Sequence, residues 1–307
     1  MTTISAAKKM SDFSGFIDKE KAGPIFEKAA ESSIIMRLVR QVPLGLVGTD
    51  IPVFTGTVQA GWVSEGDRKP KTEGSMALKT LTPKKLAAIH VVSQEVLRAD
   101  PGTYLELMRK EIGEAFARSF DAACIHGKDL VTGGAGPFST SLADTTKSQE
   151  LGGSAQASGG VYQDLIGGLE ELVDADKELN GFAVSPRLEP RLLGAVDTSG
   201  RPIWSASAPT DGLPSSNLLG RPAFVAKSVH EADSTVEAIG GDWTQAAWGV
   251  IGGINYSVSA ETAVTINGSL VSLWENNLVA IRMEAEYGWV CADTDAFVLY
   301  LNNSGAE

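Results

Sequence analysis

A stripe of apolar residues predicts one long helix in the first half of the chain. Asp100 is a good N-cap, Pro101 suits the first helical position and Gly127 suits the position just after the last turn. Between them, large apolar side chains recur every three or four residues, at Leu105, Met108, Ile112, Phe116 and Phe120. At 1.5 Å per residue this helix is about 37 Å long, which is long enough to act as the spine of a subunit.

Before this helix, the pattern changes to two strand-like segments around a polar loop. Residues 51–54 and 80–93 have the apolar positions of strands, whereas 61–74 is charged and is interrupted by Gly and Pro residues. This is the pattern of a long two-stranded arm. An isolated two-stranded ribbon is marginally stable in water, so we expect the arm to lie on another surface, which favours a self-assembling protein.

The rest of the chain alternates between short helical and strand patterns, which predicts an α+β fold. Helical spacing occurs at 32–41, 161–178 and 186–196, and residues 1–30 read as an arm with one short helix near 19–30. Strand patterns occur at 181–185, 218–226, 278–290, 296–300 and 85–93, where Ala87, Ile89 and Val91 are expected to share one face. Residues 243–259 read as strand, turn, strand, and the apolar-poor stretch 131–160 reads as a loop.

Charge is distributed unevenly along the chain, whose net charge is −12. Residues 1–129 have 18 Lys and Arg against 16 Asp and Glu, and residues 130–307 have 8 against 22. The arm itself is basic, with Arg68, Lys69, Lys71, Lys79, Lys84 and Lys85 against Glu65, Asp67 and Glu73. A basic arm beside an acidic body favours contact between copies, although a solvated hairpin tip fits the charges equally well. The acidic balance argues against sequence-specific nucleic-acid recognition.

No motif in the sequence indicates a catalytic or metal site. The phosphate-binding Gly-Lys-Ser/Thr loop, the Gly-x-Ser-x-Gly nucleophile elbow and paired Cys or His metal motifs are absent. The three histidines, His90, His126 and His230, are scattered, and Cys124 and Cys291 read as buried apolar residues. His126 follows the helix, where a partial positive charge suits the dipole. We therefore expect no catalytic residue, no metal and no cofactor.

Two pairs of acidic residues are candidate cation ligands with a simpler interpretation. Asp174-x-Asp176 and Asp293-x-Asp295 have the spacing of cation ligands, but isolated Asp-x-Asp pairs are usually solvated surface.

The N-terminus has no apolar run typical of a secretory signal, and 243–260 is too polar to span a membrane. We expect a protein that is made in the cytoplasm and has no membrane partner.

One arrangement suggests covalent chemistry between copies. Lys69 and Lys71 lie at the arm tip, and Asn276 and Asn277 lie in the C-terminal part. A lysine amine and an asparagine side chain can form an isopeptide bond if a buried carboxylate with a raised pKa acts as the base. The simpler interpretation is that these lysines form ordinary salt bridges between subunits.

Several short motifs recur in the order found in one known family. The chain has Trp62-Val-Ser-Glu-Gly66, Lys69-Pro70 and the strand 81–87, followed by the long helix. Later come Phe182-Ala-Val-Ser-Pro186, Leu219-Gly-Arg-Pro222, Gly241-Asp-Trp243 and Arg282-x-Glu-x-Glu-Tyr-Gly-Trp-Val290. In this order the chain resembles the tailed-bacteriophage major capsid proteins of the Hong Kong 97 fold over roughly residues 30–300.

The resemblance implies an L-shaped α+β subunit with named parts. These are an N-terminal arm at 1–30, a peripheral domain at 31–50 and 84–130 with its spine helix at 101–126, and an extended hairpin loop (E-loop) at 51–83. An apical domain would follow at 131–255, with a return to the peripheral domain at 256–307. The hairpin would lie over a neighbouring subunit through Trp62, Glu65, Asp67, Arg68, Lys69, Lys71 and Glu73.

The function implied is structural. The resemblance implies a major capsid protein that forms the pentamers and hexamers of an icosahedral phage head around double-stranded DNA. Expected partners are other copies, a separate scaffolding protein, a portal, a decoration protein and non-specifically contacted DNA, in a virion assembled in the host cytoplasm. The alternatives are an encapsulin, which is a nanocompartment shell protein of the same fold, and a cytosolic enzyme.

Overall fold

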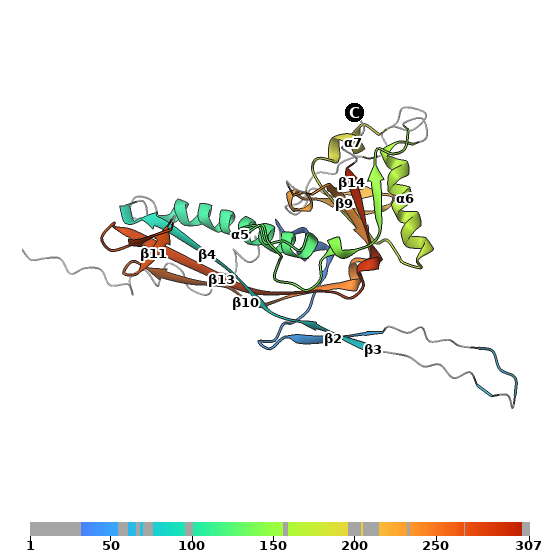
Figure 1. Cartoon of the computed structure of the whole chain (residues 1–307), viewed down its shortest axis with the longest axis horizontal. Helices are drawn as coiled ribbons and strands as arrows, with labels where there is room; N and C mark the ends of the chain where they lie inside the picture. Colours follow the sequence, from blue (N-terminus) through green and yellow to red (C-terminus); the bar gives the residue numbers. More distant parts are fainter. Residues whose placement is uncertain are drawn as a thin grey trace, which may run out of the picture.

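The computed structural model describes residues 32–54, 61–65, 68–69, 76–95, 101–155, 159–195, 204, 215–231, 234–266 and 268–302 (Figure 1). The expected N-terminal arm lies outside these residues, as do Asp67, Lys71 and Glu73 of the expected contact set. In Figure 1, one long helix lies along a long sheet, a compact sheet stands at one end of it, and a two-stranded ribbon projects beyond it.

The long sheet has four strands. Their order is β1 (Arg40–Gln41), β10 (Ala246–Ser259), β13 (Leu278–Cys291) and β4 (Lys84–Ser93), and β13 pairs antiparallel with both β10 and β4. Helix α5 (Pro101–Ile125) lies along this sheet and confirms the predicted long helix. Its apolar stripe packs on the sheet, where the Phe120 and Tyr287 ring centroids are 5.0 Å apart.

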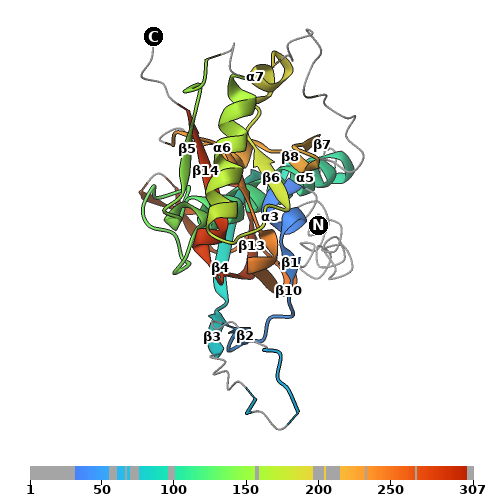
Figure 2. The same cartoon turned by 90° about the vertical axis from the view of Figure 1, so that its right-hand side faces the viewer.

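The compact sheet has six strands. Their order is β5 (Ser148–Leu151), β14 (Phe297–Asn302), β9 (Val236–Gly241), β6 (Gly181–Val184), β8 (Arg221–Val225) and β7 (Ser215–Leu218). Helix α6 (Val161–Asp174) lies in front of this sheet in Figure 2, and α7 (Glu189–Leu193) lies near one end of α6. The core between them contains Leu165, Leu172, Phe182 and Tyr300.

Short elements complete the fold. They are α3 (Ile34–Leu38), the ribbon strands β2 (Thr49–Phe54) and β3 (Met76–Leu81), the hairpin strands β11 (Ala263–Ile266) and β12 (Ser269–Ser272), and the 3₁₀ turns Leu142–Asp144, Lys227–Val229, Trp243–Gln245 and Thr294–Ala296. No helix among the described residues is both long and apolar enough to cross a membrane.

Replacing either of two adjacent glycines of α6 with alanine is expected to change the free energy of unfolding differently at the two positions. A Cβ on Gly168 would lie 2.5 Å from the Tyr300 hydroxyl, whereas a Cβ on Gly167 would lie 3.1 Å from the flexible Gln149 side chain. Gly168→Ala should therefore lower the free energy of unfolding by about 1–3 kcal/mol through overpacking. Gly167→Ala should be neutral or stabilising by up to about 1 kcal/mol, because alanine favours helix. Urea denaturation of the two variants compares them, and equal effects would show that the α6–β14 contact is not tight.

The structure differs from the sequence-based expectation at several elements. Helix α6 ends at Asp174 rather than 178, since Asp176 has a positive φ of 55°. The helix expected at 186–196 is only α7, and the expected loop at 131–160 contains β5. The expected strand, turn, strand at 243–259 is the single strand β10, whose register shifts between Ile251 and Asn255 around two glycines with positive φ.

Two further expectations need correction. The boundary proposed at residue 255 falls inside β10, and β14 (297–302) belongs to the compact sheet rather than returning to the long one. The pattern Ala87, Ile89, Val91 does mark one face of β4, but two of these residues are exposed and one is half-buried. The opposite face of β4 carries the buried Val92 and the half-buried Leu86, which joins the core beneath α5.

Candidate functional site

The ribbon formed by β2 and β3 projects from the body of the subunit. Its strands pair antiparallel, with Pro52 opposite Leu78 and Ile51 opposite Lys79. Because side chains alternate across a strand, Ile51 and Lys79 lie on one face, and Pro52 and Leu78 lie on the other. That second face is exposed: Leu78 is 65 % and Met76 is 57 % accessible. An apolar face of this kind is a candidate contact surface.

The loop that closes the ribbon carries the described members of the expected contact set. Trp62 is fully exposed, and Glu65, Arg68 and Lys69 are also exposed. A large aromatic side chain beside basic residues is typical of the residues that dominate protein interfaces. The isolated subunit therefore presents the expected contact residues to solvent without a partner surface of its own.

A shallow apolar groove lies between β4 and α5. It has a volume of about 430 Å³ and is lined by Ala88, Ile89, His90, Met108, Glu111, Ile112, Ala115, Phe116, Arg118 and Met283. This groove runs beside the free edge of the long sheet, because β4 is its last strand.

A second exposed apolar site lies in and beside the β11–β12 hairpin. Leu270 is 75 % and Trp274 is 77 % accessible. In Figure 1 this hairpin lies at the end of the long sheet farthest from the compact sheet. Asn276 and Asn277 follow it and are exposed, and the Asn276 amide donates a 2.7 Å hydrogen bond to the Ser272 carbonyl.

The surroundings of Asn276 lack the base that an isopeptide bond needs. Among the described residues, the buried carboxylates are Asp121, Asp164 and Glu237, and none of them lies on the β11–β12 hairpin or the ribbon. The neighbouring Glu275 is exposed. Within the described residues of one subunit, no desolvated carboxylate on these elements is available to accept a proton from the lysine amine.

We therefore expect no covalent link through Lys69 and Asn276. Assembled particles boiled in denaturant should give a single gel band near the chain mass of 32.3 kDa. A ladder of higher bands that Asn276→Ala removes would contradict this expectation. Asn277→Gly, which suits the positive φ of 56° at that position, tests the second candidate asparagine, and a ladder that it removes would contradict the expectation equally.

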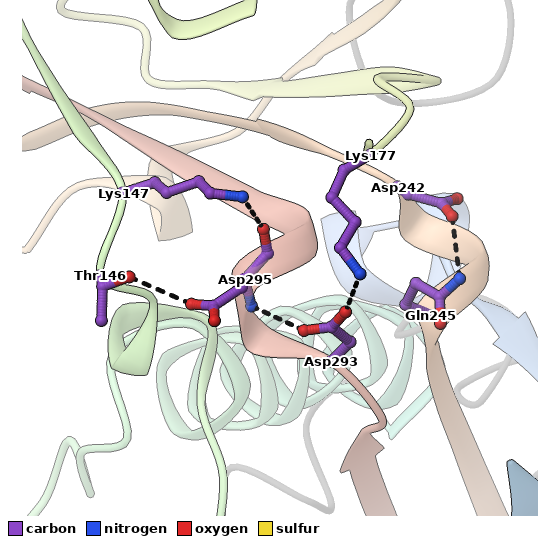
Figure 3. Close-up of polar contacts among 7 residues, drawn as sticks. All are labelled: Thr146, Lys147, Lys177, Asp242, Gln245, Asp293 and Asp295. Atoms are coloured by element: carbon purple, nitrogen blue, oxygen red, sulfur yellow. Dashed lines mark hydrogen bonds and ion pairs between the residues drawn. The ribbon is translucent and has the colours of Figure 1, made fainter. Parts of the chain in front are cut away.

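We call the region between the two sheets the neck. It comprises the connecting segments Thr145–Lys147, Asp242–Ala246 and Ala292–Ala296 and the neighbouring loop Lys177–Asn180, and Figure 3 shows polar contacts among some of its residues. Asp293 accepts from the Asp295 backbone N–H and forms a 2.5 Å ion pair with Lys177. Asp295 accepts from Thr146, and its carbonyl accepts from Lys147. The pair Asp293-x-Asp295 is thus used in capping and bridging contacts within the subunit.

A second connection in the neck parallels the first. Asp242 caps its 3₁₀ turn by accepting from the Thr244 N–H, and it also accepts from the Asn180 amide at 2.6 Å. The backbone joins the two turns directly, since the Ala292 N–H donates to the Gln245 carbonyl and the Asp242 N–H donates to the Ala296 carbonyl. The loop after α6 thereby ties both turns to the compact sheet.

A buried carboxylate fastens α3 to the long helix. Asp121 of α5 is fully buried and accepts hydrogen bonds from the hydroxyls of Ser33 (2.5 Å) and Ser228 (2.7 Å). It also accepts from the N–H groups of Ile34 (3.1 Å) and Ile35 (3.4 Å), the first residues of α3. Burial raises the pKa of Asp121 to about 6, and these four hydrogen bonds act in the opposite direction.

Two histidines, His126 and His230, lie near each other in this part of the subunit. Burial lowers the pKa of His126 to about 4, and backbone contacts with Ser228 and Val229 oppose the shift. His126 is therefore neutral at pH 7, and the expected favourable charge at the helix end is wrong. His230 Nδ1 lies 3.8 Å from Glu237 Oε1. The part of the chain that the structure describes contains no group of three or more potential metal ligands.

The remaining candidates also have structural roles. Cys124 and Cys291 are buried free thiols, as expected. Asp174 and Asp176 are exposed, at and just after the end of α6. Several exposed apolar and charged groups lie on the ribbon and on or beside the β11–β12 hairpin, and such groups suit a protein that assembles with other copies.

Comparisons with known proteins agree with this class. The model of the phage capsid family matches residues 14–301. The chain belongs to the phage capsid family. It is 38 % identical to the probable major capsid protein gp17 of Mycobacterium phage L5, over 97 % of this chain and 92 % of that protein, and 36 % identical to the gp17 protein of Mycobacterium phage D29, over 94 % and 91 %.

Solved structures support the same fold. A structure from Gordonia phage Cozz aligns with a TM-score of 0.70 and 28 % identity, over 90 % of this chain and 87 % of that one. The capsid of a native GTA particle aligns with a TM-score of 0.61 and 17 % identity, over 90 % of each chain, which shows the fold alone. The α+β capsid fold is therefore confirmed, and family membership implies a structural role in the virion. These relatives give no support to the encapsulin alternative.

Proposed function

We propose that this chain is the major capsid protein of a phage head and that it forms pentamers and hexamers of an icosahedral shell around double-stranded DNA. The observation that carries the proposal is the ribbon. It exposes an apolar face and a basic, Trp-bearing loop that its own subunit does not cover. A monomeric protein would gain nothing from such an element, whereas a shell protein can use it to tie neighbours together.

The parts of the Hong Kong 97-type subunit can be proposed with revised boundaries. The ribbon and its loop (49–81) correspond to the extended hairpin loop, and α5 corresponds to the spine helix. The long sheet with β11 and β12 corresponds to the peripheral domain. The compact sheet, including β14, corresponds to the apical domain, so that this domain comprises about 148–241 and 297–302.

Within this proposal, Trp62, Glu65, Arg68 and Lys69 contact the neighbouring subunit, together with Asp67, Lys71 and Glu73. A separate scaffolding protein, a portal and a decoration protein are the proposed partners during and after assembly in the host cytoplasm. Contact with packaged DNA is non-specific, because the chain is acidic overall and attracts no particular base sequence.

Electron microscopy of the purified protein, alone and with candidate scaffolding protein, tests the proposal. Closed shells with pentameric and hexameric units are expected, and the heads isolated from phage should be DNA-filled. Small particles of about 20–40 nm without nucleic acid but with a bound cargo enzyme would favour the encapsulin alternative. A protein that stays monomeric with every candidate partner at high concentration would overturn the proposal.

A further inference from the structure

A polar hollow lies where the long helix meets the compact sheet, and we call it the basic hollow. It has a volume of about 350 Å³, within the roughly 300–1,000 Å³ of ligand pockets. Three segments line it: the C-terminal part of α5, the loop that follows α5, and the 3₁₀ turn after β8. Figure 1 shows this end of α5 beside the compact sheet. The lining residues are Arg118, Lys128, Asp129, Leu130, Gly133, Lys227, Ser228, His230 and Glu231.

The basic hollow gathers three cationic side chains from separate parts of the sequence. Arg118, Lys128 and Lys227 form no ion pair among the described residues. Arg118 uses its Nε to donate to the Glu114 carbonyl of its own helix at 3.4 Å, which leaves the two terminal NH₂ groups of the guanidinium for a ligand. The surrounding chain has the opposite charge, since residues 130–307 have 8 Lys and Arg against 22 Asp and Glu. A local reversal of this kind attracts anions.

Two acidic residues of the basic hollow do not cancel these charges. The Asp129 carboxylate accepts from the Val131 N–H at 3.0 Å and from the Thr132 hydroxyl at 2.9 Å, so it is engaged within its own loop. Glu231 is half-buried. With His230 neutral, three positive and two negative side chains leave the lining with a net charge of +1.

His230 supplies a buried ring nitrogen to the basic hollow. Its side chain is 11 % accessible, and its Nδ1 donates to the Val236 carbonyl at 3.2 Å. The other ring nitrogen, Nε2, is buried and has no hydrogen-bond partner in the described part of the chain. Buried polar groups are normally hydrogen-bonded, so this nitrogen is a candidate ligand contact. A protonated imidazole donates from both nitrogens, so Nε2 can donate to an anion while Nδ1 keeps its own bond.

Hydrogen bonds fix the backbone around the basic hollow. The Ser228 hydroxyl donates to Asp121 of α5 at 2.7 Å, which holds the 3₁₀ turn against the helix. The loop after α5 is closed by a 2.7 Å hydrogen bond from the Gly136 N–H to the Gly127 carbonyl. The three cations therefore project from fixed positions, which lowers the cost of ordering the site when a ligand binds.

We propose that the basic hollow binds a phosphate group, which is held by the three cations and by His230. Guanidinium and ammonium groups form charge-assisted hydrogen bonds with phosphate, whose oxygens accept from several donors at once. The phosphate belongs either to the backbone of DNA or to a free anion such as pyrophosphate. Contacts to phosphate carry no base sequence information. The inference goes beyond the proposed shell function and does not require that shells form.

Calorimetric titration of unassembled subunits with pyrophosphate, a short oligothymidylate and tetraglutamate tests the ligand class. Both phosphate probes are expected to bind, and more weakly as the salt concentration rises. Tighter binding of the oligothymidylate would assign the site to DNA, and tighter binding of pyrophosphate would assign it to a free anion. Tetraglutamate that binds as tightly as pyrophosphate would overturn phosphate as the ligand. Absence of binding by both phosphate probes would overturn the site.

A triple variant locates the binding. Arg118→Gln, Lys128→Gln and Lys227→Gln together should weaken the binding of either phosphate probe at least about tenfold, because three charge contacts of modest individual strength are lost. In ¹⁵N NMR spectra of the wild type, the His230 Nε2 signal should shift as pyrophosphate is added. An unchanged His230 signal would overturn the proposed geometry. If the triple variant fails to fold, this signal decides alone.

The matched control removes three exposed cations outside the basic hollow. Lys84→Gln, Lys110→Gln and Arg187→Gln together change the net charge equally and should alter the affinity less than about twofold, since solvent and salt screen distant charges. Equal weakening by the two triple variants would indicate general attraction to the protein surface and would overturn the site. All of these measurements use unassembled subunits, so a failure to form shells would refute the shell function and leave their result unaffected.

Discussion

Reversing the charge of the ribbon loop, with Arg68→Glu, Lys69→Glu and Lys71→Glu together, is expected to prevent shell assembly while the subunit stays folded. Arg68 and Lys69 are exposed and have no ion pair among the described residues, so their removal costs the subunit little. Each exposed ion pair contributes roughly 0.2–1 kcal/mol, and reversal turns three attractions into repulsions. The subunit concentration needed for assembly should rise at least about tenfold, as measured by sedimentation and electron microscopy.

The control variant for this prediction keeps a positive charge at all three positions and exchanges arginine and lysine. Arg68→Lys, Lys69→Arg and Lys71→Arg should assemble like the wild type, because each position stays positively charged although the ammonium and guanidinium groups differ in geometry. The melting temperature of unassembled subunits should stay within about 2 °C for both triple variants. Assembly of the reversed variant at the wild-type concentration, or an equal loss of melting temperature in its free subunit, would show that the loop acts within the subunit.

Removal of the Asp121 side chain is expected to cause the largest loss of subunit stability. Asp121→Ala leaves two serine hydroxyls and two backbone N–H groups of α3 without their acceptor in a buried site. An unsatisfied buried donor costs about 1–3 kcal/mol. The removed carboxylate was itself disfavoured by burial, so we expect a net loss of about 2–4 kcal/mol. Urea denaturation of unassembled subunits at pH 7.5 measures it, and a loss below 1 kcal/mol would contradict the role of Asp121.

The pH dependence separates Asp121 from its neighbour His126. The pKa of Asp121 rises on folding from 3.8 to about 6, so its contribution to stability is fully present below pH 4 and is lost as the pH rises to 6. The pKa of His126 falls on folding from 6.5 to about 4, so stability is lost as the pH falls from 6.5 to 4. At 1.36 kcal/mol per unit, each effect amounts to about 3 kcal/mol, and the two oppose each other in the wild type.

Single substitutions should therefore reveal opposite slopes. Between pH 6.5 and pH 4, Asp121→Asn should lose about 3 kcal/mol relative to the wild type, and His126→Asn should gain about the same. Stability curves from urea denaturation in this window give both slopes, with all other titrating groups held constant. Curves for both variants that run parallel to the wild type would show that neither group changes its pKa on folding.

The elements that the sequence predicted well are those with local signals. The long helix has a stripe of apolar residues and a glycine with a φ of 62° after its last turn, and the structure confirms both. β9 was missed for a physical reason: all six of its residues are buried, so apolar and polar positions do not alternate. Its last two residues, Gly240 and Gly241, look like a turn but serve packing, because a Cβ on Gly241 would lie 2.6 Å from the Phe297 ring.

The candidate surfaces were predictable only in part. Charge and composition indicated the ribbon loop as a candidate contact surface. For the buried site at Asp121, the only local signal was the position of this aspartate on the buried side of α5. Its partners Ser33 and Ser228 lie 88 and 107 residues away in the chain. The free edge of β4 was likewise hidden, because alternation within a strand indicates two faces and does not reveal which one is covered. The order of strands in the sheet decides this, and that order depends on contacts between distant segments.

In the proposed shell, the neck also determines how each subunit bears tension. Three separate stretches of the chain cross it, at Thr145–Lys147, Asp242–Ala246 and Ala292–Ala296, and side-chain and backbone hydrogen bonds tie these stretches together. A pull that separates the compact sheet from the long sheet is shared among three covalent crossings. Two of these continue directly as β10 and β13, the central strands of the long sheet. Tension therefore runs along strand axes into the middle of the sheet and does not peel away an edge strand.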